Sequence, residues 1–177
     1  MASAALPPEI ADYFNKWVFG AMFGDTEKII NSGCNLPAAL CLSTYTEVLG
    51  GFLRGKLGAD GESRLNYEAF LHYLGDEYVK IDHELSQHGG LYRMIRCGLV
   101  HEYFPKDSSG VARATDPPIE RGGILRLQNQ VYVILRVYLE DFKRGAKKYF
   151  DELSSSPDLQ RNFLLSWKNI TKYGIKT

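Results

Sequence analysis

Leu91-Tyr-Arg-Met-Ile-Arg-Cys-Gly-Leu-Val-His-Glu-Tyr-Phe-Pro105 is the stretch in which charged side chains enter an otherwise apolar helical run. Arg93 and Arg96 precede His101, and Tyr103 follows two residues later. The proline ends the run, because it lacks an N–H donor and its ring clashes with the preceding turn. A fixed guanidinium and a titratable imidazole on such a helix can bind an anion and move a proton. The alternative is a helix whose polar side chains are satisfied locally, and these residues leave both interpretations open.

The hydrophobic pattern on either side of this stretch is helical, with apolar residues repeating at three and four. We expect helices over about 8–22 with a short continuation to 30, 36–53, 66–85 with Gly75 as the place for a kink, 91–104, 129–153, and from 158 onward. Between 106 and 129 two short runs separated by Asp116-Pro-Pro118 indicate a small β-hairpin or an irregular insertion. The sequence therefore predicts one all-α domain over 1–177, an up-down bundle of five or six helices with this insertion before the long fifth helix.

Composition restricts the function further. The chain has 177 residues with 21 Lys and Arg against 21 Asp and Glu, so no global field gathers nucleic acid and any anion site must be local. Its three cysteines are odd in number and lack a C-x-x-C spacing, which is typical of a reduced, cytoplasmic protein. The first ten residues lack the features of a secretory signal, and no apolar segment looks long enough to span a bilayer. We expect a cytoplasmic protein without a membrane partner.

The spacing of Arg96 and His101 does not place them together on an ideal helix. Five residues correspond to about 140° around the axis and roughly 7.5 Å along it. Two arrangements can bring the side chains to one site. Either the helix is distorted before Pro105, or a second copy of the helix completes the site across a two-fold axis.

Arg96-Cys-Gly-Leu-Val-His101, late in a helical bundle, resembles the R-x-x-x-x-H signature of HEPN domains. Thr44-Tyr-Thr-Glu-Val-Leu-Gly-Gly51 fits the Glu-bearing second helix of that pattern. The resemblance implies metal-independent RNA cleavage by a homodimer, with no cofactor and with two motifs meeting at the dimer interface. His101 would then serve as general acid or base, and Arg96 would hold the scissile phosphate.

Three further residues extend the resemblance. His101-Glu-Tyr103 makes the motif similar to that of HEPN toxins paired with a nucleotidyltransferase antitoxin, in which the matching tyrosine accepts a nucleotide. The sequence by itself favours a half-buried aromatic at a helix end for Tyr103. Glu47 lies off the core stripe of its helix, and it can pair with Arg96 or Arg93 in a supporting role or stay solvated.

Cys97 departs from the family pattern, because the residue after the motif arginine is often polar in active members. This residue and the zero net charge favour a second hypothesis, a non-catalytic helical binding or scaffold module that kept the fold. His83 and His88 do not have the helical spacing of a metal-binding pair, so we expect no metal site.

Overall fold

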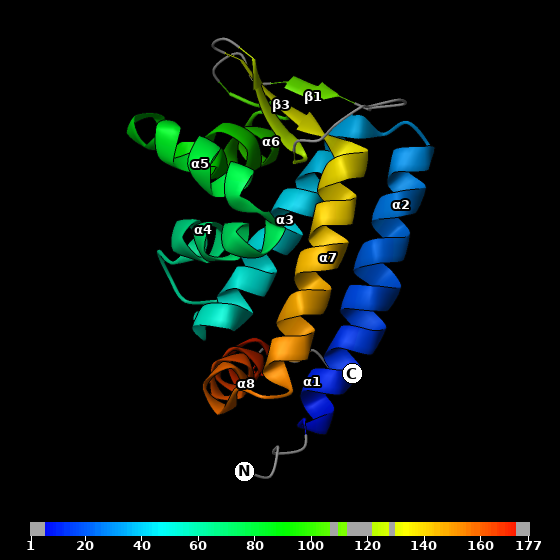
Figure 1. Cartoon of the computed structure of the whole chain (residues 1–177), viewed down its shortest axis with the longest axis vertical. Coiled ribbons are helices and arrows are strands. Elements are labelled where there is room, and N and C mark those ends of the chain that lie inside the picture. The colour runs from blue at the N-terminus through cyan, green and yellow to red at the C-terminus, as the bar shows by residue number, and fades with distance from the viewer. Residues whose placement is uncertain (1–5, 107–109, 113–121, 128–129, 173–177) are drawn as a thin grey trace.

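The computed structural model describes residues 6–106, 110–112, 122–127 and 130–172. It is an all-α bundle with a small sheet before a long helix, as the sequence predicts (Figure 1). Its elements in chain order are α1 (Pro8–Tyr13), the π-helical η1 (Phe14–Met22), α2 (Phe23–Asn31), α3 (Asn35–Arg54), α4 (Ser63–Leu74), α5 (Asp76–Glu84), the 3₁₀ turn η2 (Ser86–His88), the π-helical η3 (Tyr92–Cys97), α6 (Gly98–His101), β1 (Gly110–Ala112), β2 (Ile124–Leu127), β3 (Gln130–Ile134), α7 (Leu135–Leu153) and α8 (Pro157–Thr171).

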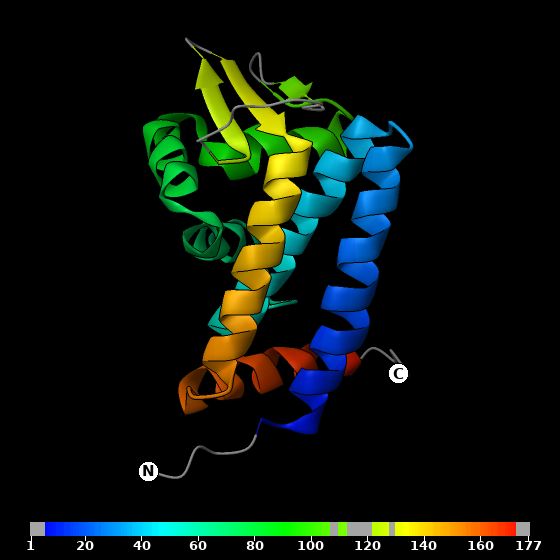
Figure 2. The same ribbon diagram turned by 45° about the vertical axis from the view of Figure 1, so that its right-hand side comes forward.

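Three long helical runs form the body of the bundle. The segment from α1 through η1 to α2 is continuous past Gly20 and Gly24, although glycine is a poor helix former. This run, α3 and α7 lie side by side along the long axis, and α8 lies across their lower end (Figure 2). Aromatic rings fill the junction with α8, where Phe52 and Phe163 stack with their centroids 4.2 Å apart. The core is therefore built from the apolar faces that the periodicity marks.

Helices α3 and α4 approach each other closely. The Gly50-Gly51 pair in α3 can indicate either such an approach or a frayed helix end. Both glycines are buried, and a Cβ on Gly50 would collide with the carbonyl oxygen of Asn66. The pair therefore serves close packing, and α3 continues past it to Arg54.

The sheet differs from the expected hairpin. Strands β2 and β3 pair antiparallel, with Ile124 opposite Val133, while β1 pairs parallel with β3. The long helix consequently begins at Leu135 instead of 129, and the run Val131-Tyr-Val-Ile134 belongs to a strand. These β-branched and aromatic residues satisfy both periodicities, and pairing with β2 decides between them. The predicted turn at 107–109 and Asp116-Pro-Pro118 lie outside the described residues.

Two other boundaries are corrected. Gly75, with φ at 142°, separates α4 from α5, so the predicted kink is a full break. The expected start at 66 is also corrected, because α4 begins at Ser63 and Asn66 is buried inside it. Its amide oxygen accepts a hydrogen bond from Arg54 at 2.6 Å, which ties α4 to the end of α3.

Contrary to the expectation, one helix meets the length and hydropathy of a membrane span. This helix is α3, and 56% of its most apolar window is buried inside the fold. Its buried face packs against α4 and α8, as expected for the central helix of a bundle.

Candidate functional site

The helix that carries the Arg–His motif is irregular over most of its length. Asp82 accepts a hydrogen bond from the Leu91 N–H at 2.7 Å and so fixes the start of the helix. Residues Tyr92–Cys97 form a π-helix, a rare conformation that is frequent at functional sites, and only Gly98–His101 is α-helical. The helix ends at His101, three residues before the predicted end at Phe104. The helix is thus distorted before Pro105, but no hydrogen bond or ion pair joins His101 to Arg96 in the described part of the chain, so the distortion does not by itself make one site of them.

The chain reverses directly after this helix. Tyr103 has φ at 62°, a left-handed conformation that is costly for a side chain of this size. The Lys106 N–H then donates to the Met94 carbonyl oxygen at 2.8 Å. A Cβ on Gly98 would lie 2.6 Å from the Phe104 carbonyl oxygen, so the motif glycine makes room for this reversal.

Arg96 is held by Glu47 of α3. The Arg96 Nε lies 2.7 Å from the Glu47 Oε2, at angles that make the contact an ion pair and not a hydrogen bond. The two side chains are only 20% and 12% exposed. Glu47 is therefore buried against η3, and it neither stays solvated nor pairs with Arg93. Within the described residues no hydrogen bond engages the two terminal nitrogens of Arg96, which remain able to contact an anion.

The ring of Tyr92 lies one helical turn before Arg96. The Arg96 Cζ lies 5.6 Å from the ring centroid, within the range of a cation–π contact. Burial raises the pKa of the Tyr92 hydroxyl, and the neighbouring guanidinium offsets part of this rise. Glu47 and Tyr92 together fix the guanidinium in one place. The i, i+4 spacing of Tyr92 and Arg96 could have revealed this contact from the sequence.

The remaining motif residues point outward. Arg93 is exposed and donates to the His88 carbonyl oxygen at 3.3 Å. His101 is exposed, and no hydrogen bond or ion pair joins it to Arg96 in the described part of the chain. Tyr103 is 58% exposed, so the expectation of a half-buried ring is wrong. One subunit places the arginine in a partly buried setting and leaves the imidazole at the surface.

Exposed apolar side chains flank His101 in the sequence. Val100, Tyr103 and Phe104 are 43%, 58% and 61% exposed, and we call them the 100–104 patch. They are three of the seven large hydrophobic residues that are exposed among the described residues. Contiguous exposed apolar residues of this kind are typical of interaction sites.

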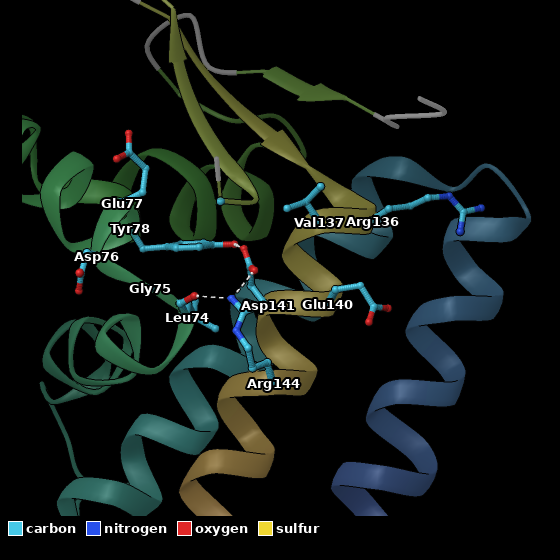
Figure 3. A pocket seen from close by; sticks show the side chains of 11 residues that line it. Leu74, Gly75, Asp76, Glu77, Tyr78, Arg136, Val137, Glu140, Asp141 and Arg144 are labelled. Atoms are coloured by element: carbon cyan, nitrogen blue, oxygen red, sulfur yellow. Dashed lines mark hydrogen bonds and ion pairs between the residues drawn. The ribbon is translucent and has the colours of Figure 1, made fainter. Parts of the chain in front are cut away.

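A second cluster lies between α5 and α7, beside a pocket of ≈ 550 Å³ (Figure 3). The Tyr78 hydroxyl donates to Asp141 at 2.7 Å, the Gly123 N–H donates to the same carboxylate oxygen at 2.8 Å, and Arg144 donates to the other oxygen at 2.6 Å. Burial and the charge of Asp141 raise the pKa of Tyr78 far above its ordinary value. Because every member is paired, this cluster fastens the sheet to the bundle and leaves no group for chemistry.

Comparison with protein-family models, with curated proteins and with solved structures gave no match. Among the residues that the structure describes, no group of three or more His, Cys, Asp and Glu side chains is arranged to hold a metal ion. The three cysteines are free, and Cys97 is partly buried. The candidate site therefore consists of the Arg96–Glu47 pair with Tyr92 below it, and of His101 within the 100–104 patch.

Proposed function

We propose that the protein is a metal-independent RNA endonuclease of the HEPN type that acts as a homodimer. The observation that carries the proposal is the Arg96–Glu47 ion pair. A carboxylate of one helix and an aromatic ring hold a partly buried guanidinium, while its terminal nitrogens stay unbonded to the described residues. This is what a phosphate-binding arginine requires, since a fixed fork loses little entropy when it binds.

The chemistry assigned to the two residues follows from their side chains. The His101 imidazole takes the proton of a ribose 2′-hydroxyl as that oxygen attacks the adjacent phosphorus. The partner's motif histidine returns a proton to the leaving 5′-oxygen. Arg96 binds the phosphate oxygens, on which negative charge increases in the transition state. An imidazole suits both proton transfers, because its ordinary pKa of about 6.5 is close to neutral pH.

The homodimer accounts for the separation of the two groups within one subunit. A second copy that docks on the 100–104 patch would bury its apolar side chains and add a second Arg–His motif to the site. The test is the mass in solution of the wild type and of Phe104→Asp. The variant should become monomeric and lose cleavage, whereas Leu65→Asp, at an exposed leucine on α4, should change neither. A wild type that stays monomeric at all concentrations would contradict the composite site.

The cleavage assay addresses catalysis directly. Single-stranded RNA should be cut in the presence of EDTA, and His101→Ala or Arg96→Ala should reduce the rate by at least about 100-fold. His72→Ala removes an exposed histidine on α4 and serves as the matched control. Arg96→Lys keeps the charge but not the fork, and we expect partial activity at most. Equal activity in the wild type and His101→Ala would refute the assignment.

Tyr103 supports a regulated form of this function. Its exposed ring beside His101 is accessible to a nucleotidyltransferase antitoxin, and a nucleotide attached there would repel RNA. The protein would then be a cytoplasmic toxin, and its free cysteines are consistent with a reducing compartment. Mass spectrometry after co-expression with a neighbouring nucleotidyltransferase should find the added mass on Tyr103 and none on Tyr103→Phe.

A non-catalytic binding or scaffold module is the second candidate, and Cys97 is the observation that favours it. In the position after the motif arginine it cannot orient a phosphate or a water molecule as a polar side chain would. If this candidate is correct, the wild type has no nuclease activity, and Cys97→Asn does not gain any. Cleavage that Cys97→Asn enhances would favour the nuclease.

A further inference from the structure

A second pocket, of ≈ 520 Å³, lies where α1 and η1 meet α8. This is the lower end of the molecule, opposite the end that holds α6 and the sheet (Figures 1 and 2). Aromatic rings and carboxylates dominate its lining, which consists of Glu9, Asp12, Tyr13, Asn15, Lys16, Trp17 and Trp167. Both tryptophans of the chain contribute to it. No residue of the Arg96 motif lines this pocket, and binding here does not depend on RNA cleavage.

The helical spacing of the first segment gathers these side chains. Glu9, Asp12, Tyr13 and Lys16 follow one another at three and four and so share one face. Trp17 lies in the π-helical η1, and the described residues contain only one other π-helix, the one that carries Arg96. Such π-helical turns are frequently found at functional sites.

The aromatic walls of the pocket come from two elements. The Tyr13 and Trp167 rings meet edge to face with their centroids 5.6 Å apart, and this contact fixes the α8 side of the pocket. The Trp17 indole is 37% exposed on the other helix. Aromatic faces carry negative electrostatic potential, and tryptophan attracts cations most strongly of the three rings. The walls therefore favour a positively charged ligand.

One cation of the protein already uses this property. The Lys16 Nζ lies 5.0 Å from the centroid of the Trp17 ring, a cation–π contact within the pocket. Glu9 and Asp12 are exposed and form no ion pair within the described residues. Two unpaired carboxylates against one ammonium leave the pocket negative, with capacity for a further positive charge.

We infer that this pocket binds a small quaternary ammonium group such as that of choline. A trimethylammonium has no N–H donor to satisfy, so aromatic faces and nearby carboxylates can replace its weak hydration. A primary ammonium has three N–H donors that the aromatic rings leave unsatisfied, so it would depend on the two carboxylates or on water for them. The free small molecule and the trimethylated lysine side chain share this chemistry.

Tryptophan fluorescence provides a direct readout, because both tryptophans line the pocket. Choline should change the emission saturably, with a Kd below about 1 mM at constant ionic strength. Its uncharged isostere, with a tert-butyl group in place of the trimethylammonium, should bind at least about tenfold more weakly. Calorimetry should give the same order of affinities. Trimethyllysine, tested in parallel, shows which of the two molecules that carry a trimethylammonium group binds more tightly.

Variants of the lining residues separate their contributions to cation binding. Trp17→Leu, followed through Trp167, and Asp12→Asn should each weaken binding about three- to tenfold, whereas Leu165→Ala, at an exposed leucine on α8, should not. Lys16→Ala should tighten binding severalfold, because it removes the competing cation. Equal binding of choline and its isostere would overturn the inference. It would also be overturned if neither choline nor trimethyllysine binds at 10-fold the limit of about 1 mM, or if Lys16→Ala binds choline more weakly than the wild type does.

Discussion

The Arg96 Nε lies 2.7 Å from the Glu47 Oε2, and this contact joins the π-helix η3 to the middle of α3. The pair is partly buried, so neither charge is fully hydrated. Removal of one partner leaves the charge of the other unpaired at a site where water hydrates it poorly, which destabilises the folded state. Stability and the proposed phosphate contact thus depend on the same guanidinium.

A double-mutant cycle measures this coupling. Arg96→Ala and Glu47→Gln should each lower the free energy of unfolding by about 1–3 kcal/mol, and the double variant should lose less than the sum by at least about 1 kcal/mol. Urea denaturation of the four proteins provides the values. Arg161 with Asp158, an exposed pair on α8, is the control and should show a coupling below about 0.5 kcal/mol. Additive losses at Arg96 and Glu47 would mean that the contact contributes nothing.

The left-handed backbone of Tyr103 leads to a second prediction, on the stability of variants at this position. Asparagine tolerates this conformation better than tyrosine does, and a β-branched residue tolerates it worst. Because the ring is exposed, little packing is lost on substitution. Tyr103→Asn should raise the free energy of unfolding by about 0.5 kcal/mol, and Tyr103→Val should lower it by about 1 kcal/mol. Thermal unfolding in which valine is the more stable variant would contradict the strained backbone.

The glycines of the long helices should respond in opposite directions to alanine. Gly50→Ala places a methyl group on the Asn66 carbonyl oxygen and forces α3 from α4, with an expected loss of about 3 kcal/mol or more. Gly24→Ala, where nothing lies within 4 Å of the new methyl group, should gain about 0.5–1 kcal/mol from helix propensity. Chemical denaturation of the two variants and the wild type measures both changes in the free energy of unfolding. A mild effect at Gly50 would show that the two helices lie farther apart than described.

Asp82 gives the stability a pH dependence. Burial raises the pKa of its carboxyl, and the hydrogen bond from the Leu91 N–H opposes part of the rise. The folded chain therefore keeps this proton to a higher pH than the unfolded chain. Above the ordinary pKa of an aspartate, about 4, the folded state therefore binds more protons at this site, so its contribution to stability falls as the pH rises until the folded carboxyl is ionised.

Asp82→Asn removes this contribution and keeps an oxygen to accept from Leu91. The stability of the variant relative to the wild type should therefore increase as the pH rises above about 4, and it should level off once the folded carboxyl of the wild type is ionised. Urea titrations at several pH values provide the test. A difference that falls with pH would show that the carboxyl is more acidic in the folded chain.

Local patterns in the sequence determined the fold class and most helices. The three–four periodicity places both ends of α3 and the start of α8 within one residue, because each helix has one apolar face and a clear start. The signal was ambiguous at Val131-Tyr-Val-Ile134. These residues fit a helix and a strand alike, and pairing with the preceding strand β2, which side-chain periodicity does not report, makes them a strand.

The motif residues could be named from the sequence, but their setting could not. The position of Glu47 off the core stripe of its helix left two alternatives open, a solvated side chain or a pair with Arg96 or Arg93. The tertiary structure buries Glu47 and Arg96 together because the π-helical η3 packs on α3. It exposes His101 and Tyr103 because the chain reverses at a left-handed residue. Side-chain periodicity follows from the backbone geometry of a single element, whereas ion pairing and exposure depend on which elements pack together. The sequence alone therefore identified the helices and the motif, and the packing of α3 against η3 decided which charged groups are buried.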